Sequence, residues 1–173
     1  TWPRLGEERS RWLYPIGTMQ RTGARVGFGS DWYVTSVNPL DGIETAVTRL
    51  DPNGLTHEPL GVDEEITLAE AIENYTINGA YVNFLDDQVG SIEVGKQADL
   101  IVLDRNLFTI PAHEINETTV IATFFEGCLV YVSSEGYKFW EDQQSIPETI
   151  FCAGSINFRR EIASRKDIND GWN

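Results

Sequence analysis

The chain has 173 residues, 41% of them hydrophobic, and its 13 Lys and Arg against 27 Asp and Glu give a formal net charge of −14 at pH 7. This composition excludes a disordered or collagen-like chain, no apolar run reaches the ~20 residues of a membrane-spanning helix, and the length excludes an intact eight-stranded α/β barrel of about 250 residues. The acidic excess, without a cluster of Lys or Arg, also excludes a nucleic-acid partner, because phosphate recognition depends on such clusters.

The first predicted elements are a short helix and a strand. The helix starts at Tyr14-Pro15, with the proline in its first turn, and ends before Gly23. Residues 25–29 then alternate apolar side chains with glycines, which predicts a strand with one apolar face. The strand ends at Ser30 and Asp31, where a loop begins.

Two further helices are predicted after this loop. The first starts at Asn38-Pro39, an N-cap followed by a proline in the first turn, and its apolar stripe extends to Leu50. The second starts at a capping box formed by Thr67 and Glu70. Its apolar face extends to Val82, so we predict one long helix.

Four short strands separated by turns are predicted after residue 90, namely residues 91–94, 98–103, 120–125 and 128–132. They would form a small β module that follows the α/β part. Residues 135–173 mix aromatic and charged side chains without a clear period. We leave them as an appended, unassigned tail with a helix near residues 158–166.

The chain has two cysteines, Cys128 and Cys152. Two cysteines are too few for a disulfide framework, and their spacing fits no zinc motif. We therefore predict free thiols at both positions.

Asp31 is the most informative polar residue, because it follows a predicted strand at its carboxyl end and precedes a loop into a helix. Catalytic and ligand-binding groups of barrel and doubly wound folds gather at this position. A carboxylate held there can bind a divalent metal and take a proton from a metal-activated water. Local sequence alone favours a simpler interpretation, in which Asp31 is a turn or N-cap residue.

Trp32 follows Asp31 directly and is our candidate for contact with a substrate, although an aromatic residue after a strand can also serve packing alone. From Asp31 to Asp104 the chain has fifteen acidic residues against only Arg49 and Lys96. We interpret most of these carboxylates as a solvated surface and leave a role in cation binding to the remainder.

Two other chemical interpretations fit the sequence poorly. Residues 27–32 begin like a dinucleotide-binding fingerprint, but Trp32 stands where the last glycine should allow close packing. Ser30 lacks the G-x-S-x-G context of a hydrolase nucleophile, so a triad with His57 is disfavoured. His57 and His113 lack H-x-H or H-E-x-x-H spacing, and we interpret both as surface residues.

Several of these segments, taken in order, resemble one known family. They include GARVGFGSDW over residues 23–32, TLAEA over residues 67–71 and, above all, GSIEVGKQADLIVLD over residues 90–104. Their order and spacing over about residues 11–132 are similar to the C-terminal part of amidohydrolase family 3, a branch of the metal-dependent amidohydrolase superfamily. Residues 135–173 fall outside the resemblance.

The resemblance implies an α/β fold, namely the C-terminal fragment of a (β/α)8 TIM barrel plus part of a small β-sandwich. Residues 25–30 would be the eighth barrel strand. Residues 1–85 would be the end of the barrel, residues 86–134 the C-terminal strands of the composite sandwich, and residues 135–173 the appended tail.

The resemblance also implies a role for Asp31, which falls on the family's eighth-strand aspartate. That aspartate binds the catalytic metal and accepts a proton from the hydrolytic water. The implied reaction is hydrolysis of a carbon–nitrogen bond other than a peptide bond, in an amide, imide or formamide, with Zn²⁺ or a similar divalent ion as cofactor. The family's other metal ligands have no counterpart here and would lie before Thr1, so we expect this chain alone to be inactive.

The expected partners are a small-molecule substrate and the remainder of the barrel, in the same or another chain. Exposed sheet edges would favour homo-oligomers, whereas no nucleic acid and no membrane is expected as a partner. The sequence favours a cytoplasmic location but identifies no compartment, because a signal peptide could precede Thr1. The alternative function is a non-catalytic acidic interaction module or a degenerate hydrolase relative.

Overall fold

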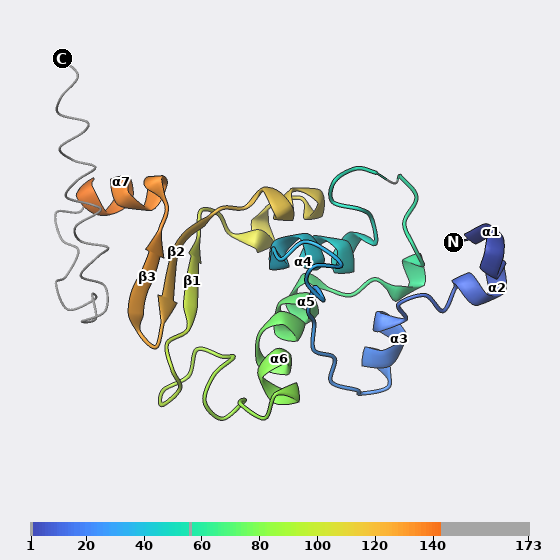
Figure 1. Cartoon of the computed structure of the whole chain (residues 1–173), viewed down its shortest axis with the longest axis horizontal. Coiled ribbons are helices and arrows are strands. Elements are labelled where there is room, and N and C mark those ends of the chain that lie inside the picture. Colours follow the sequence, from blue (N-terminus) through green and yellow to red (C-terminus); the bar gives the residue numbers. More distant parts are fainter. Residues whose placement is uncertain (1, 56, 143–173) are drawn as a thin grey trace, which may run out of the picture. The chain divides into compact units, whose positions relative to one another are not determined.

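The computed structural model describes residues 2–55 and 57–142 (Figure 1). The described part of the chain divides into two compact units, of which the first comprises residues 2–55, 57–96 and 105–118 and the second residues 97–104 and 119–142. Helices build the first unit, and a small antiparallel sheet lies in the second. None of the described helices has the length and apolar character that crossing a bilayer requires.

The first unit is built from short helices. They are α1 (Trp2–Leu5), α2 (Glu7–Ser10), α3 (Ile16–Arg21), α4 (Pro39–Thr48), α5 (Leu68–Tyr75) and α6 (Ile77–Val82), with the 3₁₀ helices η1 (Val62–Glu64), η2 (Leu107–Thr109) and η3 (Ala112–Glu117). The predicted starts of α4 and α5 are confirmed. At the start of α4 the Leu40 N–H donates to the Asn38 side chain at 3.1 Å, and at the start of α5 Thr67 and Glu70 form the reciprocal capping box.

The predicted long helix is wrong, because it is two helices that meet at Thr76. A continuous helix would use the Asn74 carbonyl for the N–H four residues later. That carbonyl instead accepts a hydrogen bond from the Phe28 N–H at 2.9 Å. Thr76 has φ −117° and ψ −97°, outside helical geometry. The contact with residue 28 therefore replaces one bond of the helical ladder and marks the break.

The strand predicted at residues 25–29 does not form within the described residues, because the segment makes no ladder with a neighbour there. A strand needs an adjacent strand for its N–H and C=O groups, and the described residues of the first unit contain none. The alternation of burial survives nevertheless. Val26, Phe28 and Ser30 are half-buried, while the residues between them are exposed.

Residues 91–94 likewise form no strand, and they belong with residues 86–96 to the helical unit. Ser91 Oγ donates to Glu93 Oε1 at 2.6 Å and accepts from Lys96 Nζ at 2.6 Å. These side-chain bonds support a local turn, because they pair the polar groups within one short segment.

Arg49, the residue that follows α4, is buried and is the main hydrogen-bond donor between separate segments of the first unit. Its Nε donates to the Leu60 carbonyl at 2.7 Å, and one Nη donates to the carbonyls of Leu13 at 3.3 Å and Tyr14 at 3.2 Å. The Leu60 N–H in turn donates to the Arg49 carbonyl at 2.9 Å. One guanidinium thus fixes two other segments to the end of α4.

A second buried charge, Glu64, holds α3 against η1. The N–H and the hydroxyl of Thr18 donate to its two carboxylate oxygens at 2.6 and 2.5 Å, and the Arg21 guanidinium lies 3.6 Å away. Burial alone would raise the pKa of Glu64. The Thr18 hydrogen bonds and the charges of Arg21 and Arg49 outweigh burial and lower that pKa.

A third buried charge, Glu44, links α4 to η3. The side chain is only 4% exposed, and one oxygen accepts a hydrogen bond from the Asn116 N–H at 2.9 Å. Asn116 also donates from its side chain to the Pro52 carbonyl at 3.2 Å. Burial raises the pKa of Glu44, although the Asn116 hydrogen bond and His113 act in the opposite direction.

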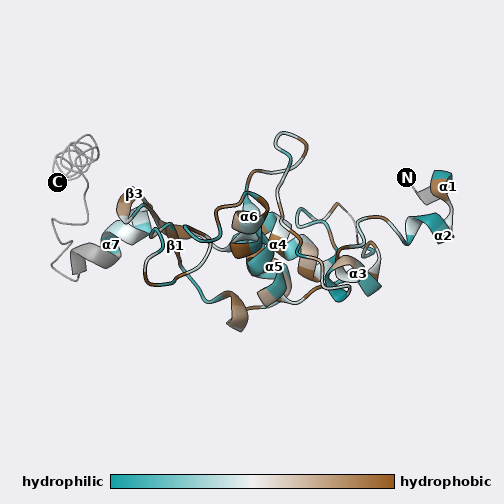
Figure 2. Cartoon of the chain, turned by 90° about the horizontal axis from the view of Figure 1, so that it is seen from below, coloured by the Kyte–Doolittle hydropathy of each residue, from teal (hydrophilic) through white to brown (hydrophobic). Residues whose placement is uncertain are grey.

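The second unit contains β1 (Leu100–Leu103), β2 (Val120–Phe125) and β3 (Cys128–Val132), which form an antiparallel sheet in the order β1-β2-β3. These strands confirm the last three predicted ones, except that β1 starts two residues later. Figure 2 shows β1 and β3 as hydrophobic strands. Ala122, Leu129 and Val132 form the buried core of the sheet, and Phe124 and Tyr137 pack against it.

The helix α7 (Ser134–Asp142) follows β3 and forms part of the segment that we left unassigned. It packs against β2 and β3, and Gly136 lies close to Ile121 and Val132. The predicted helix near residues 158–166 lies outside the described residues. The prediction of free thiols is wrong for Cys128, which is disulfide-bonded; Cys152 lies outside the described residues.

We expect Arg49→Lys to lower the free energy of unfolding by about 1.5–3 kcal/mol, because an ammonium group cannot reach all three carbonyls and a hydrogen bond from a charged donor contributes about that much. Urea denaturation of the chain measures the difference. Arg11→Lys is the matched control, since Arg11 is exposed and should change by less than about 0.5 kcal/mol. Equal losses in the two variants would contradict the role given to Arg49.

The two buried carboxyls should respond to pH with opposite signs. Glu44 has a raised pKa in the folded state, so its ionisation destabilises the fold as the pH rises from the ordinary value of 4.5 through the folded pKa. Glu44→Gln should therefore stabilise the chain at pH 8, by up to about 1 kcal/mol, and the difference should vanish near pH 4.

Glu64→Gln is the control for this pH dependence. Its pKa is lowered in the folded state, so the carboxylate stabilises the fold above 4.5 and this contribution disappears as the pH falls through the folded pKa. The variant should be less stable than the parent at pH 8, with a smaller deficit at low pH. Urea denaturation at both pH values measures these differences. If the two substitutions changed the free energy of unfolding at pH 8 in the same direction, the opposite roles given to Glu44 and Glu64 would be refuted.

Candidate functional site

Residues 25–30 lead to Asp31 and lie along α5 and α6. Gly27 approaches α6 closely, because a Cβ there would lie 3.0 Å from Val82 Cγ2 and 3.4 Å from the Asn78 carbonyl. The Arg25 guanidinium stacks over the Tyr81 ring at 4.1 Å from its centroid. Contacts with α6 thus help to set the path of the segment towards Asp31.

The Tyr75 ring joins this segment to α4. It meets the Phe28 ring edge-to-face, with centroids 5.3 Å apart and an interplanar angle of 75°. Its hydroxyl lies so close to Gly42 that a side chain at residue 42 would overlap it. Burial, with a smaller contribution from Asp41, raises the pKa of the Tyr75 phenol. Sequence periodicity predicted an apolar face on this helix but could not identify Phe28 and Gly42 as neighbours of Tyr75.

Asp31 itself is exposed and has a backbone φ of 49°. This left-handed conformation is one that aspartate tolerates better than most residues. Its carbonyl accepts a hydrogen bond from the Val34 N–H at 2.8 Å, so a tight turn follows directly. Turn geometry therefore agrees with the simpler interpretation of Asp31, and a ligand role stays a prediction.

The turn after Asp31 presents large apolar side chains. Trp32 is 69% exposed, Tyr33 86%, Val34 70% and Val37 68%. The Thr35 hydroxyl donates to the Ser30 carbonyl at 2.7 Å and closes the turn at its base. Contact between Trp32 and a substrate stays a prediction.

The described residues do not form a complete metal site. Nowhere within residues 2–55 and 57–142 do three or more His, Cys, Asp or Glu side chains gather in a way that could hold an ion. His57 and His113 are exposed, as predicted. Asp31 is therefore one candidate ligand without a ligand set around it, and no catalytic step follows from these residues alone.

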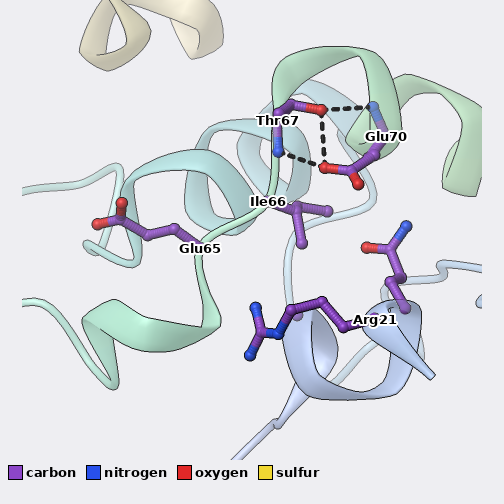
Figure 3. Close-up of a pocket in the computed structure, with 7 residues that line it drawn as sticks. Arg21, Glu65, Ile66, Thr67 and Glu70 are labelled. Carbon is purple, nitrogen blue, oxygen red and sulfur yellow. Dashed lines mark hydrogen bonds between the residues drawn. The ribbon is translucent and has the colours of Figure 1, made fainter.

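A cavity of about 420 Å³ lies elsewhere in the first unit, between α3 and the start of α5 (Figure 3). Asp31 and Trp32 are not among the residues that line it, which are Gly17, Gln20, Arg21, Glu65, Ile66, Thr67 and Glu70. Figure 3 shows Ile66 between the Arg21 stem and the Thr67 end of the cavity. Its lining comes from segments about fifty residues apart, so the sequence offered no signal for it.

Most polar groups of this cavity already have structural partners. Glu70 accepts hydrogen bonds from Thr67, which lower the pKa of its carboxyl, and Arg21 donates to the Thr18 hydroxyl and the Asp63 carbonyl. The side-chain oxygen of Gln20 is buried without a partner among the described atoms. The cavity holds neither a nucleophile with a base nor a metal-ligand set, so Asp31 remains the better candidate site.

The chain is similar in sequence to one known family and to individual proteins. The sequence profile of the amidohydrolase family matches residues 1–131. The N-substituted formamide deformylase of Arthrobacter pascens is 38% identical over 119 residues, which cover 69% of this chain and 21% of that protein. The S-triazine hydrolase of Gordonia rubripertincta is 35% identical over 114 residues, which cover 65% of this chain and 23% of that protein.

A solved structure shows a related fold. The crystal structure of an amidohydrolase from Thermotoga maritima MSB8 aligns with a TM-score of 0.52 and 19% sequence identity, over 68% of this chain and 26% of that chain. At this identity the likeness concerns the fold alone. The chain thus spans about a fifth to a quarter of the length of these relatives.

We expect Gly42→Ala to lower the free energy of unfolding by about 1–3 kcal/mol, because overpacking against Tyr75 outweighs the gain of about 1 kcal/mol in helix propensity. Tyr75→Phe removes the overlapping hydroxyl and should recover part of the loss. A double-mutant cycle by urea denaturation should give a coupling energy of at least about 0.5 kcal/mol.

Gly29→Ala provides the control for this cycle. A Cβ at residue 29 would meet no atom within 4 Å, so its effect should add to that of Tyr75→Phe. If the effects of the Gly42 and Tyr75 substitutions on the free energy of unfolding were also additive, the contact between α4 and the Tyr75 ring would not contribute to stability as we infer.

Proposed function

This chain belongs to the amidohydrolase family, and from that membership we propose that it is part of a metal-dependent hydrolase that cleaves a carbon–nitrogen bond other than a peptide bond. The family profile over residues 1–131 carries the proposal. Relatives named as a formamide deformylase and an s-triazine hydrolase support the bond type. An amide, imide or formamide of a small molecule is the substrate class.

Within this proposal, residues 1–85 are the end of a (β/α)8 barrel, with residues 25–30 as its eighth strand. The alternating burial of Val26, Phe28 and Ser30 supports this assignment, because a barrel strand presents alternate residues to its two faces. Residues 86–134 contribute the C-terminal strands of a composite β-sandwich, of which β1, β2 and β3 are candidates. The remainder of both structures lies in the same or another chain.

Asp31 supplies one ligand to the divalent metal, Zn²⁺ or a similar ion. Its position after the proposed eighth strand supports this role, since ligands gather at the carboxyl ends of barrel strands. Its exposed carboxylate has no hydrogen bond or ion pair among the described residues, so both oxygens are available. The other ligands lie outside the described residues, and this chain alone is inactive.

A non-catalytic acidic interaction module is the second candidate function. One observation favours it, namely that the described residues hold no set of three metal-ligating side chains. The net charge of −14 would then serve a basic partner. The two functions differ in whether Asp31 affects metal content and hydrolysis.

The native polypeptide that carries this chain should be assayed for hydrolysis of N-substituted formamides and for bound metal. The same assay is applied to a hybrid protein, in which this chain replaces the 119 matched residues of the Arthrobacter pascens deformylase. We expect metal-dependent hydrolysis in both. Asp31→Asn should reduce kcat/KM by about 10²- to 10⁴-fold and lower the metal content measured by elemental analysis.

Asp87→Asn is the matched control, because Asp87 is also an exposed aspartate of the first unit. It should leave both readouts unchanged. Full activity and full metal content in Asp31→Asn would overturn the role of Asp31. If the native polypeptide and the hybrid both fold but neither bind metal nor hydrolyse any amide, the acidic interaction module would be favoured.

A further inference from the structure

The turn formed by Trp32, Tyr33, Val34 and Val37, called here the aromatic turn, carries a further inference. We propose that the aromatic turn binds an apolar substituent, aromatic or branched aliphatic, of the substrate. The inference rests on the proposed function, because it places the substrate next to Asp31. It adds a substrate class that the family as a whole does not specify.

The first argument is exposure. The four residues are 68% to 86% exposed to solvent. They lie within six consecutive positions of the chain. A contiguous apolar patch of this kind marks a binding surface more often than a single exposed residue does. Tyr and Trp also offer large contact areas at a low cost in side-chain entropy.

The second argument is that the turn is held in place by its own polar groups. The Asp31 carbonyl accepts from the Val34 N–H at 2.8 Å, and the Thr35 hydroxyl donates to the Ser30 carbonyl at 2.7 Å. The Ser36 hydroxyl accepts from the Asn38 N–H at 3.1 Å, next to the start of α4. A fixed turn presents its side chains without the cost of ordering a flexible loop.

The third argument is charge. No Asp, Glu, Lys or Arg occurs from residue 32 to residue 40, although the chain as a whole is strongly acidic. The hydroxyls of Thr35 and Ser36 are engaged within the turn, so the apolar side chains are what the turn leaves exposed. No ionised side chain within residues 32–40 can pair with a charged substituent, which would lose water on contact with this surface. The turn therefore discriminates against charged substrates.

The position of the turn favours a substrate over another occupant. The aromatic turn is continuous with Asp31 and connects residues 25–30 to α4, and in α/β folds ligands bind at loops of this kind. The competing occupant is the remainder of the polypeptide, which would cover the same side chains as part of a core. If the substrate contacts the turn, a substitution there changes substrate preference. If the remainder of the polypeptide covers the turn, the substitution changes stability.

The test compares two amides, N-(2-phenylethyl)formamide and the cationic N-(2-aminoethyl)formamide, in the native polypeptide and in the hybrid. We expect kcat/KM for the phenylethyl amide to be at least about 10-fold higher, since one or two buried methylene equivalents are worth about 10- to 200-fold. Trp32→Ala and Tyr33→Ser should each reduce this ratio several-fold by lowering kcat/KM for the phenylethyl amide alone. Leu55→Ser, at a residue that is 81% exposed outside the turn, should leave the ratio unchanged.

A binding measurement separates this inference from the proposed function. Equilibrium dialysis against the Asp31→Asn variants, in which turnover is reduced, should show at least 10-fold tighter binding of the phenylethyl amide, and Trp32→Ala should remove that preference. Such a preference without any hydrolysis in the parent would sustain the inference and refute the proposed activity. Hydrolysis of both amides without a binding preference would refute the inference and sustain the proposed activity.

Thermal unfolding distinguishes the competing occupant. Tyr33→Ser should change the substrate ratio and leave the melting temperature unchanged. A lower melting temperature with an unchanged ratio would show that the side chain is covered by protein, and it would overturn the inference. Val37→Ser gives a second, smaller substitution for the same comparison if Trp32→Ala fails to fold.

Discussion

The first unit depends on one buried guanidinium. Arg49 satisfies carbonyls from residues 13–14 and residue 60 while its own backbone closes α4. The buried member of these hydrogen bonds is the guanidinium, and a buried charge without acceptors costs more than an ordinary hydrogen bond contributes. Its carbonyl partners are therefore held close to it. The charge of Arg49 also helps to lower the pKa of Glu64, which orders α3 through Thr18.

The path from this centre to Asp31 runs through backbone and ring contacts. Arg49 fixes the end of α4, and Gly42 within α4 leaves room for the Tyr75 hydroxyl. The Tyr75 ring meets Phe28, whose N–H is held by the Asn74 carbonyl. Residues 25–30 are thus positioned by contacts with α5 and α6, without strand neighbours among the described residues, and Asp31 lies at their end.

The sequence predicts what is decided locally and misses what is decided by distant partners. The starts of α4 and α5 depend on side chains within three residues, so Asn38, Thr67 and Glu70 identify them in advance. The strand at residues 25–29 depends on neighbours that the described residues do not supply, so the alternation of burial is present and the ladder is not. Glu44 could not be matched with Asn116, because seventy-two residues separate them. Asp31 is predictable from position, whereas a ligand set requires residues brought together by the fold.

The burial of Asn74 has a consequence for covalent modification. Asn74 is fully buried, its side-chain oxygen accepts hydrogen bonds from Gln20 and Asn78, and its backbone carbonyl is bonded to Phe28. Asn74, Tyr75 and Thr76 also form an acceptor sequence for N-linked glycans. A glycan added to the unfolded chain would keep the junction of α5 and α6 from closing on residues 25–30. The folded unit and a glycosylated Asn74 are therefore mutually exclusive.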